Sequence, residues 1–276
     1  MNEFELRRAD SVEAAVRQVG ANPDARFLAG GQSLLPTMKL GLASPSLLVD
    51  LARIPGLADI ERLDAAAARA TPVLQIGAMA THAVVASSHT VRACIPALSD
   101  LADRIGDPAV RERGTLGGSL ANNDPAACYP AAVLALGATI CTDRRAIAAD
   151  DFFIGLYETA LEAGELITAV EFPIPERAGW AKFAQPASRF SLVGVFACRG
   201  ASGAVRVAVT GASTCVFRSH ALESALGVEW SAASCRRVPI EAAGLTSDMH
   251  ASADYRAQLV RVMAGRAVER AGVDAA

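Results

Sequence analysis

Two glycine pairs about 85 residues apart constrain this chain more than any other feature of its sequence. Gly30–Gly31 follows a short predicted strand, residues 25–28, and precedes a helical turn that carries Pro36. Gly117–Gly118 lies in a glycine-rich stretch and precedes Asn and Asp side chains that suit ribose and phosphate. Because glycine reaches left-handed torsions and lets the backbone approach closely, each pair can turn backbone N–H groups toward a phosphate.

Neither glycine pair fits an established phosphate fingerprint. The dinucleotide pattern GxGxxG and the phosphate loop GxxxxGK followed by Ser or Thr are both absent around them. Rossmann-type and kinase-type sites therefore have no local support. A single pair is most simply a tight turn. Two pairs, each beside polar donors, favour a phosphate-bearing cofactor held between two lobes of the chain.

The pattern of apolar residues divides the chain into three predicted lobes, 1–55, 56–174 and 175–276. The first is β-α-β-like, and its helix is expected at 10–19 with Asp10 and Glu13 as a capping box. A linker is expected around Pro55, Gly56 and the run 65–68. The other predicted strands are 47–51, 73–77 and a hairpin of 192–198 with 205–209, and the other predicted helices follow Thr81, cover 94–105 and 129–136, and begin near Ser252.

The last predicted helix has a buried and an exposed side. Its apolar positions are expected in the core and its arginines on the other faces. The expected buried set is Tyr255, Leu259, Val262 and Met263, and the expected exposed set is Arg256, Arg261, Arg266 and Arg270.

Charge and cysteine usage exclude several protein classes. The 26 basic and 29 acidic residues are dispersed, so no basic block predicts nucleic-acid binding. The first residues lack the apolar region of an export signal, and the stretch 126–141 is broken by Pro130 and Gly137, so no transmembrane segment is expected. Six cysteines without a CxxC pair argue against a metal site in this chain and favour a reduced, cytoplasmic setting.

Beyond these general features, two motifs resemble those of a known family. Residues 26–36 and 114–122 resemble the paired FAD diphosphate motifs of the medium, flavin-binding subunit of molybdenum hydroxylases, the family of carbon monoxide dehydrogenase medium subunits and the xanthine dehydrogenase flavin domain. The resemblance continues through 148–153, 164–168 and the helix 255–270. It implies an α+β fold of the vanillyl-alcohol oxidase and p-cresol methylhydroxylase type, with two α/β lobes and a C-terminal lobe of antiparallel sheet and helices.

The same resemblance implies an FAD that lies extended between the first two lobes, with its flavin ring near the third. The backbone of the two motifs would hold the diphosphate, and Ile167 and Lys182 would lie near the ring. No catalytic residue and no metal ligand is expected in this chain. The implied cofactor-binding residues are Arg26, Phe27, Leu28, Ala29, Gly30, Gly31, Gln32, Ser33, Leu34, Gly106, Thr115, Gly117, Gly118, Ser119, Asn122, Asp124, Ile167, Lys182 and Phe190.

Two positions depart from the family pattern. Cys128 stands where the family often has a carboxylate, so a hydrogen bond to ribose or adenine would be lost or taken over by Asp124. Phe190 stands where the carbon monoxide enzymes place a tyrosine, which would keep ring stacking without the phenol hydrogen bond.

The remaining histidines and cysteines have no ligand spacing. The histidines are expected at caps or on the surface, and the cysteines in the core. The four histidines are His82, His89, His220 and His250, and the five other cysteines are Cys94, Cys141, Cys198, Cys215 and Cys235.

By resemblance, the chain is an oxidoreductase subunit that relays electrons from 2Fe–2S clusters through FAD to an external acceptor. A large partner would carry the molybdenum cofactor and a small partner the clusters, in a dimer of heterotrimers. Carbon monoxide, purines, aldehydes and N-heterocycles all fit as substrates, because the large partner selects them. The alternatives are a self-contained flavin oxidase or reductase of the same fold class, and a non-catalytic nucleotide-binding or assembly module.

Overall fold

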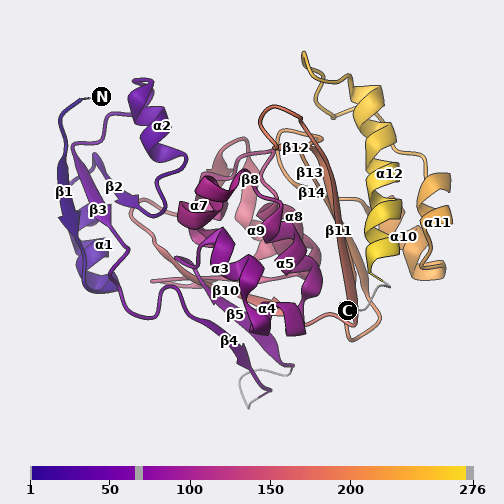
Figure 1. Cartoon of the computed structure of the whole chain (residues 1–276), viewed down its shortest axis with the longest axis horizontal. Helices are drawn as coiled ribbons and strands as arrows, with labels where there is room; N and C mark the ends of the chain where they lie inside the picture. Colours follow the sequence, from indigo (N-terminus) through magenta and orange to yellow (C-terminus); the bar gives the residue numbers. More distant parts are fainter. Residues whose placement is uncertain (1, 66–70, 272–276) are drawn as a thin grey trace.

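The computed structural model describes residues 2–65 and 71–271, which form three sheets side by side and a small hairpin (Figure 1). The strand orders are β1-β3-β2, β4-β5-β10-β6-β7 and β11-β12-β13-β14, and β8 pairs with β9. This mixed arrangement of helices and sheets confirms the predicted fold class. The expected boundaries at 55/56 and 174/175 stay predictions.

The first sheet is parallel and carries the first glycine motif at the end of one strand. It contains β1 (Glu5–Arg8), β3 (Leu47–Asp50) and β2 (Ala25–Leu28), and the helices α1 (Val12–Gly20) and α2 (Leu34–Lys39) follow β1 and β2. The predicted capping box at Asp10 is wrong. Ser11 is the N-cap residue of α1, because its extended backbone lets its hydroxyl accept a hydrogen bond from the N–H of Ala14 at 3.1 Å.

The second sheet is antiparallel along its whole width. It contains β4 (Ile60–Leu63), β5 (Val73–Gly77), β10 (Ile167–Pro173), β6 (Thr139–Thr142) and β7 (Ala146–Ala148). Strand β4 lies where the sequence predicted only a linker, because its backbone pairs with β5. The part of that predicted linker at 66–68 lies outside the described residues.

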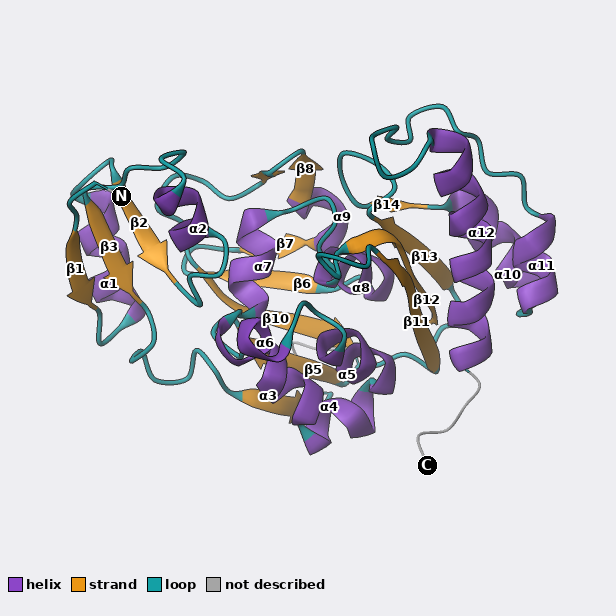
Figure 2. Cartoon of the chain, turned by 45° about the horizontal axis from the view of Figure 1, so that its top comes forward, coloured by secondary structure: helices purple, strands orange, loops and turns teal. Residues whose placement is uncertain are grey.

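Seven helices of the described chain belong to the second lobe, and most lie on one side of its sheet (Figure 2). They are α3 (His82–Ser87), α4 (His89–Cys94), α5 (Pro96–Asp103), α6 (Pro108–Arg113), α7 (Leu116–Asn122), α8 (Tyr129–Leu136) and α9 (Ala149–Phe152). The predicted helix 94–105 is wrong as one element. Ile95 leaves the helical region, with φ −144° and ψ 76°, because Pro96 disfavours a helical residue before it.

The third lobe packs helices against a four-stranded antiparallel sheet. Its elements are β11 (Arg177–Ala184), β12 (Ser191–Arg199), β13 (Val205–Thr210), β14 (Phe217–Arg218), α10 (His220–Val228), α11 (Ala232–Arg237) and α12 (Ala253–Arg270). The predicted hairpin of β12 and β13 is confirmed, as is the cap of α12 at Ser252. Helix α12 runs along β11 and β12 (Figure 1).

The predicted faces of α12 are wrong at its first turn. Tyr255 is 44% exposed, whereas Arg256 is only 3% exposed. The Arg256 guanidinium donates to the carbonyl oxygens of Leu192 and Gly211 at 2.8 and 2.7 Å and pairs with Asp248 at 2.6 Å. Burial is tolerated here because most of its donors have partners.

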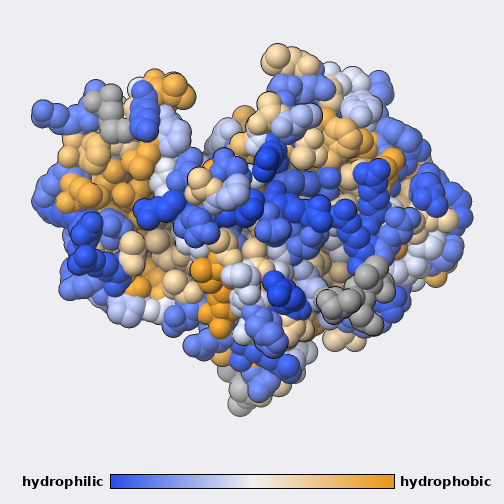
Figure 3. Space-filling view, viewed as in Figure 1, coloured by the Kyte–Doolittle hydropathy of each residue, from blue (hydrophilic) through white to orange (hydrophobic). Residues whose placement is uncertain are grey.

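Two hydrophobic cores show how the three lobes pack against one another. The first lobe has a small core around Ala15 and Val49 that also takes in Leu57 and Leu166 of the second lobe, whereas the larger second-lobe core continues into the third lobe through Trp180 and Phe196. The second and third lobes therefore share a large core, and the first lobe joins them through a smaller contact. A notch separates them in the space-filling view (Figure 3).

Candidate functional site

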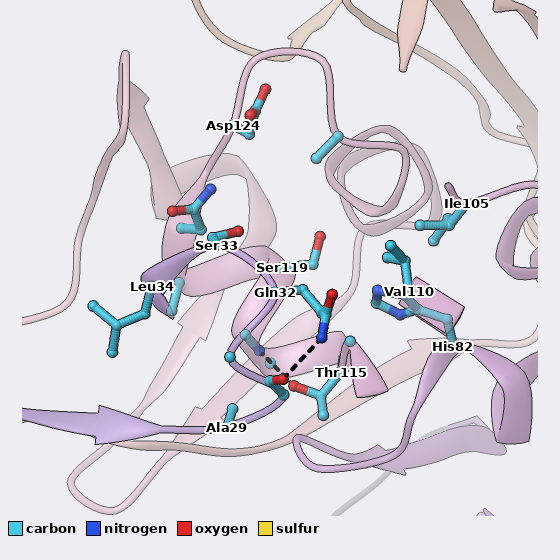
Figure 4. A pocket seen from close by; sticks show the side chains of 18 of the residues that line it. Ala29, Gln32, Ser33, Leu34, His82, Ile105, Val110, Thr115, Ser119 and Asp124 are labelled. Atoms are coloured by element: carbon cyan, nitrogen blue, oxygen red, sulfur yellow. Dashed lines mark hydrogen bonds between the residues drawn. The ribbon is translucent and has the colours of Figure 1, made fainter. Parts of the chain in front are cut away.

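A cavity of about 790 Å³ lies where the first lobe meets the other two. All nineteen residues that the sequence nominated for cofactor binding line it. Figure 4 shows Ala29, Ser33 and Leu34 of the first motif on one side of Thr115 and Ser119, with His82 and Ile105 on the other. The fold thus brings together both glycine motifs and residues of the third lobe.

The first motif is a loop whose backbone donors face no protein acceptor. Within the described chain, the N–H groups of Gly30, Gly31, Gln32 and Ser33 make no hydrogen bond to another residue. Gly31 has φ +73°, a left-handed conformation that side chains disfavour. Four consecutive unpaired backbone donors suit an anion with several acceptor oxygens.

The two motifs touch through Gly30. A Cβ atom at Gly30 would lie 2.0 Å from the carbonyl oxygen of Arg113, the last residue of α6. That distance is far below any permitted contact, so glycine is the one residue that lets the first lobe approach the start of the second motif this closely.

The second motif is helical, which corrects the prediction of a second glycine turn. Thr115 caps α7, and Gly117 and Gly118 lie inside the helix. The backbone N–H groups from 116 to 119 all donate within the protein, to the oxygens of Ala80, Ala78 and Thr115 at 2.8 to 3.1 Å. The side-chain hydroxyls of this motif, rather than its backbone, therefore face the cavity with hydrogen-bonding capacity.

The glycines of the second motif serve packing. A Cβ atom at Gly117 would lie 2.6 Å from the Cβ of Ala78, the residue that follows β5. One at Gly118 would lie 2.9 Å from the Thr115 hydroxyl oxygen and 3.5 Å from the Cβ of Ala29. Close approach of α7 to the residue after β5 requires glycine at position 117, whereas a Cβ at position 118 would crowd the capping hydroxyl and make an ordinary contact with Ala29.

His82 is a cavity residue that the sequence analysis missed by expecting a cap or surface position. It is 5% exposed, lines the cavity and packs against the Tyr129 ring at a centroid distance of 5.3 Å. Burial, and to a lesser extent the Arg111 charge, lowers the pKa of His82 to about 4, so its ring is neutral near pH 7. No sequence spacing signals this, because burial comes from residues over 30 positions away. His89, His220 and His250 are exposed, as predicted.

Three expected core cysteines are only partly buried. Cys198 and Cys235 are buried, as predicted, whereas Cys94, Cys141 and Cys215 are intermediate. Within the described residues, no group of three or more His, Cys, Asp and Glu side chains is placed to hold a metal ion.

Asn123 and Asp124 fix a hairpin to the cavity wall. The hairpin consists of β8 (Phe153–Gly155) and β9 (Glu158–Thr159). The buried Asn123 amide donates to the carbonyl oxygens of Gly155 and Glu158 at 2.8 Å each. Asp124 accepts from the N–H of Ala126 at 2.8 Å and from the Tyr157 hydroxyl at 3.4 Å. The Asp124 carboxylate, which lines the cavity, therefore already has hydrogen-bond partners in the protein.

The third-lobe end of the cavity is built around Lys182. Its ammonium donates to the carbonyl oxygens of Arg104 and Arg189 and to the Cys128 thiol. Cys128 also contacts Ser191 at 3.5 Å. Cys128 and Asp124 both line the cavity and have separate protein partners, and the expectation that Asp124 takes over a hydrogen bond to ribose or adenine stays a prediction. Phe190, 50% exposed, offers a ring face at this end.

Two further cavity residues come from the second lobe. Gly106, with φ +54°, lies in the loop between α5 and α6, and Ile167 is the buried first residue of β10. None of the described helices is both long and apolar enough to cross a membrane.

Comparisons with known proteins agree on one family. The family model described as FAD binding domain in molybdopterin dehydrogenase matches residues 2–175. The nicotine 6-hydroxylase medium subunit of Paenarthrobacter nicotinovorans is 35% identical over 95% of both chains. The carbon monoxide dehydrogenase medium chain of Hydrogenophaga pseudoflava is 34% identical over 97% of this chain and 95% of its own.

Solved structures show the same likeness over the third lobe. The structure of reconstituted CO dehydrogenase from Oligotropha carboxidovorans matches with a TM-score of 0.89 and 31% identity over 99% of both chains. Quinoline 2-oxidoreductase from Pseudomonas putida 86 matches with a TM-score of 0.85 and 32% identity, over 98% of this chain and 97% of that chain.

Proposed function

The chain belongs to the family of FAD-binding domains in molybdopterin dehydrogenases, and we propose that it holds one FAD, without a covalent bond, in the cavity between its lobes. The observation that carries this proposal is the meeting of four unpaired backbone donors of the first motif with the hydroxyls of the second in one cavity. In this proposal, all nineteen residues nominated for cofactor binding line the FAD site.

The cavity residues suit the chemical parts of FAD. The free N–H groups at 30–33 provide donors for diphosphate oxygens, and the hydroxyls of Thr115 and Ser119 add two more. Arg26 supplies a positive charge on the first-lobe side, and Phe190 supplies an aromatic face for the ring. Glycine at positions 30, 31 and 118 keeps the space between the motifs free of side chains.

Bound FAD supplies one- and two-electron redox chemistry. The chain's own residues position it: the first lobe holds the diphosphate, and the third lobe, through Lys182 and Phe190, defines the ring end. The described lining offers no ligand set for a metal. The proposed role is an electron relay from 2Fe–2S clusters on a small partner to an external acceptor.

The proposed assembly follows the names of the relatives. Several are called medium subunits or medium chains, which supports a larger and a smaller partner for this chain. The solved carbon monoxide dehydrogenase from Hydrogenophaga pseudoflava is described as lacking the Mo-pyranopterin moiety of its molybdenum cofactor, so that enzyme is one that uses such a cofactor. We place the corresponding cofactor on the large partner here, in a cytoplasmic dimer of heterotrimers, with lobe boundaries at 55/56 and 174/175.

Two measurements test the proposal. Heating or acidifying the purified chain should release all flavin into the supernatant as FAD, whereas bound flavin in the precipitate or FMN on chromatography would contradict it. The assembled complex should reduce its flavin with its own substrate, and the isolated chain should be reduced only by a small chemical reductant. Sustained substrate turnover by the chain alone, without molybdenum or iron, would favour the self-contained oxidase instead.

A further inference from the structure

Lys182 donates hydrogen bonds to three separate segments at the third-lobe end of the cavity. Its Nζ atom lies 2.6 Å from the carbonyl oxygen of Arg104, 2.9 Å from that of Arg189 and 3.5 Å from the Cys128 sulfur. These contacts join the loop after α5, the loop before β12 and the start of α8. An ammonium group has three N–H donors, so the three contacts use all of them.

The positive charge of Lys182 has no carboxylate partner. Across the described residues, no Asp or Glu oxygen lies within 4.0 Å of Nζ, and its third neighbour is a thiol. The three carboxylates that line the cavity are engaged elsewhere: Asp107 caps α6, Asp124 holds Tyr157, and Glu165 accepts from Arg145 at 3.0 Å. The charge is therefore available to whatever lies in the cavity.

We propose that Lys182 acts as a positioning residue that shapes the ring end of the cavity and, through its uncompensated charge, favours the reduced, anionic flavin. This inference rests on the FAD site proposed above. Two electrons and one proton taken up by the neutral ring leave one negative charge on it. The electrons come from a partner's cluster or a chemical reductant, and the proton comes from water. A nearby cation stabilises that charge.

Cys128 sets the strength of this effect. A thiol at 3.5 Å leaves the ammonium charge in place, whereas a carboxylate at the same position would form an ion pair and cancel most of its field. The contact geometry of Lys182 can be kept while its charge is neutralised. This separates the electrostatic role from the structural one.

The test compares Cys128→Asp with Cys128→Asn in the full chain loaded with FAD. Flavin content is measured first, and then the midpoint potential by titration with dithionite and a reference dye. We expect Cys128→Asp to lower the equilibrium constant for two-electron reduction at least tenfold relative to Cys128→Asn, which is a potential about 30 mV lower. Equal potentials in the two flavin-loaded variants would overturn the inference.

Lys182 variants test the same idea if Cys128→Asp binds no flavin. Lys182→Met removes both charge and contacts and should also lower the potential, whereas Lys182→Arg should restore the potential at least in part. A purely structural role would move flavin content and leave the potential of the remaining bound flavin unchanged. Absence of flavin from the unaltered chain would contradict the proposed FAD site itself, which distinguishes the two failures.

Discussion

The two glycine motifs look alike in sequence and differ in what their backbones do. The first is a loop with four unpaired N–H groups and a left-handed residue at Gly31. The second is the first turn of α7, and its N–H groups already donate within the protein. Gly31 provides torsional freedom in the first motif, whereas Gly30 of the first motif and Gly117 of the second allow close packing.

The two motifs therefore have different roles on their two sides of the cavity. The first motif can bind a ligand directly through its backbone. The second motif sets the distance between lobes and adds side-chain hydroxyls. Substitutions should therefore separate into those that change FAD affinity alone and those that change the packing between lobes.

The largest effect is expected from Gly30→Ala. Its Cβ would lie 2.0 Å from the Arg113 carbonyl oxygen, and backbone atoms on both sides leave no flexible group to move. Because most residues of the core around Ala15 and Val49 come from the first lobe itself, we expect that lobe to stay folded and to shift away from the second motif. FAD binding should weaken by about 4 kcal/mol, roughly a thousandfold in Kd, measured by fluorescence quenching.

Gly20→Ala is the matched control in the same lobe. Gly20 ends α1, and nothing lies within 4 Å of a Cβ atom built there. Its FAD affinity should equal that of the unaltered chain. Tight FAD binding by Gly30→Ala would show that the motifs need not touch.

The next effect concerns acid, and it arises at His82, which contacts the second motif. His82 packs against Gly114, the first residue of that motif, and burial lowers the pKa of His82 from 6.5 to about 4. The His82 ring therefore takes up a proton near pH 6.5 in the unfolded chain, but only near pH 4 in the folded chain. The stabilisation from the neutral ring is complete above pH 6.5 and is lost as the pH falls toward 4, by about 3 kcal/mol.

Urea unfolding at several pH values measures this loss. His82→Gln should flatten the dependence of the unfolding free energy on pH between 6.5 and 4, whatever its stability at neutral pH. His89→Gln, at an exposed position, serves as the control and should keep the original slope. An unchanged slope in His82→Gln would mean that the ring is solvated in solution.

A smaller effect is expected at Gly31, where torsion and contact can be separated. Its φ of +73° disfavours Ala, whereas Asn tolerates that region. The nearest atom to a new Cβ is the flexible Leu35 methyl at 2.9 Å. Gly31→Ala should lower the unfolding free energy by about 1 to 2 kcal/mol, and Gly31→Asn by less. Equal losses in thermal melting would assign the cost to the Leu35 contact.

Local sequence patterns predicted much of the fold where local forces decide it. The strand 25–28, the hairpin of β12 and β13 and the Ser252 cap follow from alternation, turn residues and a capping side chain. The same rules failed where two good N-cap residues are neighbours. Asp10 and Ser11 both suit the position, and the extended backbone at Ser11 decides between them.

The site could be predicted as a set of residues, although several of their roles could not. The motifs and the wider family resemblance nominated nineteen residues that share one cavity. Gly117 packs closely against Ala78, 39 positions earlier, and the buried His82 packs against Tyr129, 47 positions later. Long-range packing of this kind leaves no periodic or spacing signal in a single sequence.

The smallest stability change is expected at Gly118, which tests the packing role of the second motif most finely. Ala in place of Gly gains about 1 kcal/mol in helix propensity, while its Cβ, 2.9 Å from the Thr115 hydroxyl oxygen, strains the cap by a similar amount. The unfolding free energy of Gly118→Ala should therefore change by less than about 1 kcal/mol. The same methyl group faces Ala29 of the first motif at 3.5 Å and narrows the space between the motifs, so FAD affinity should fall by roughly tenfold, about 1.4 kcal/mol. Full FAD affinity in a folded Gly118→Ala chain would show that the cofactor does not need glycine at position 118, and would leave Gly117 as the residue that sets the spacing.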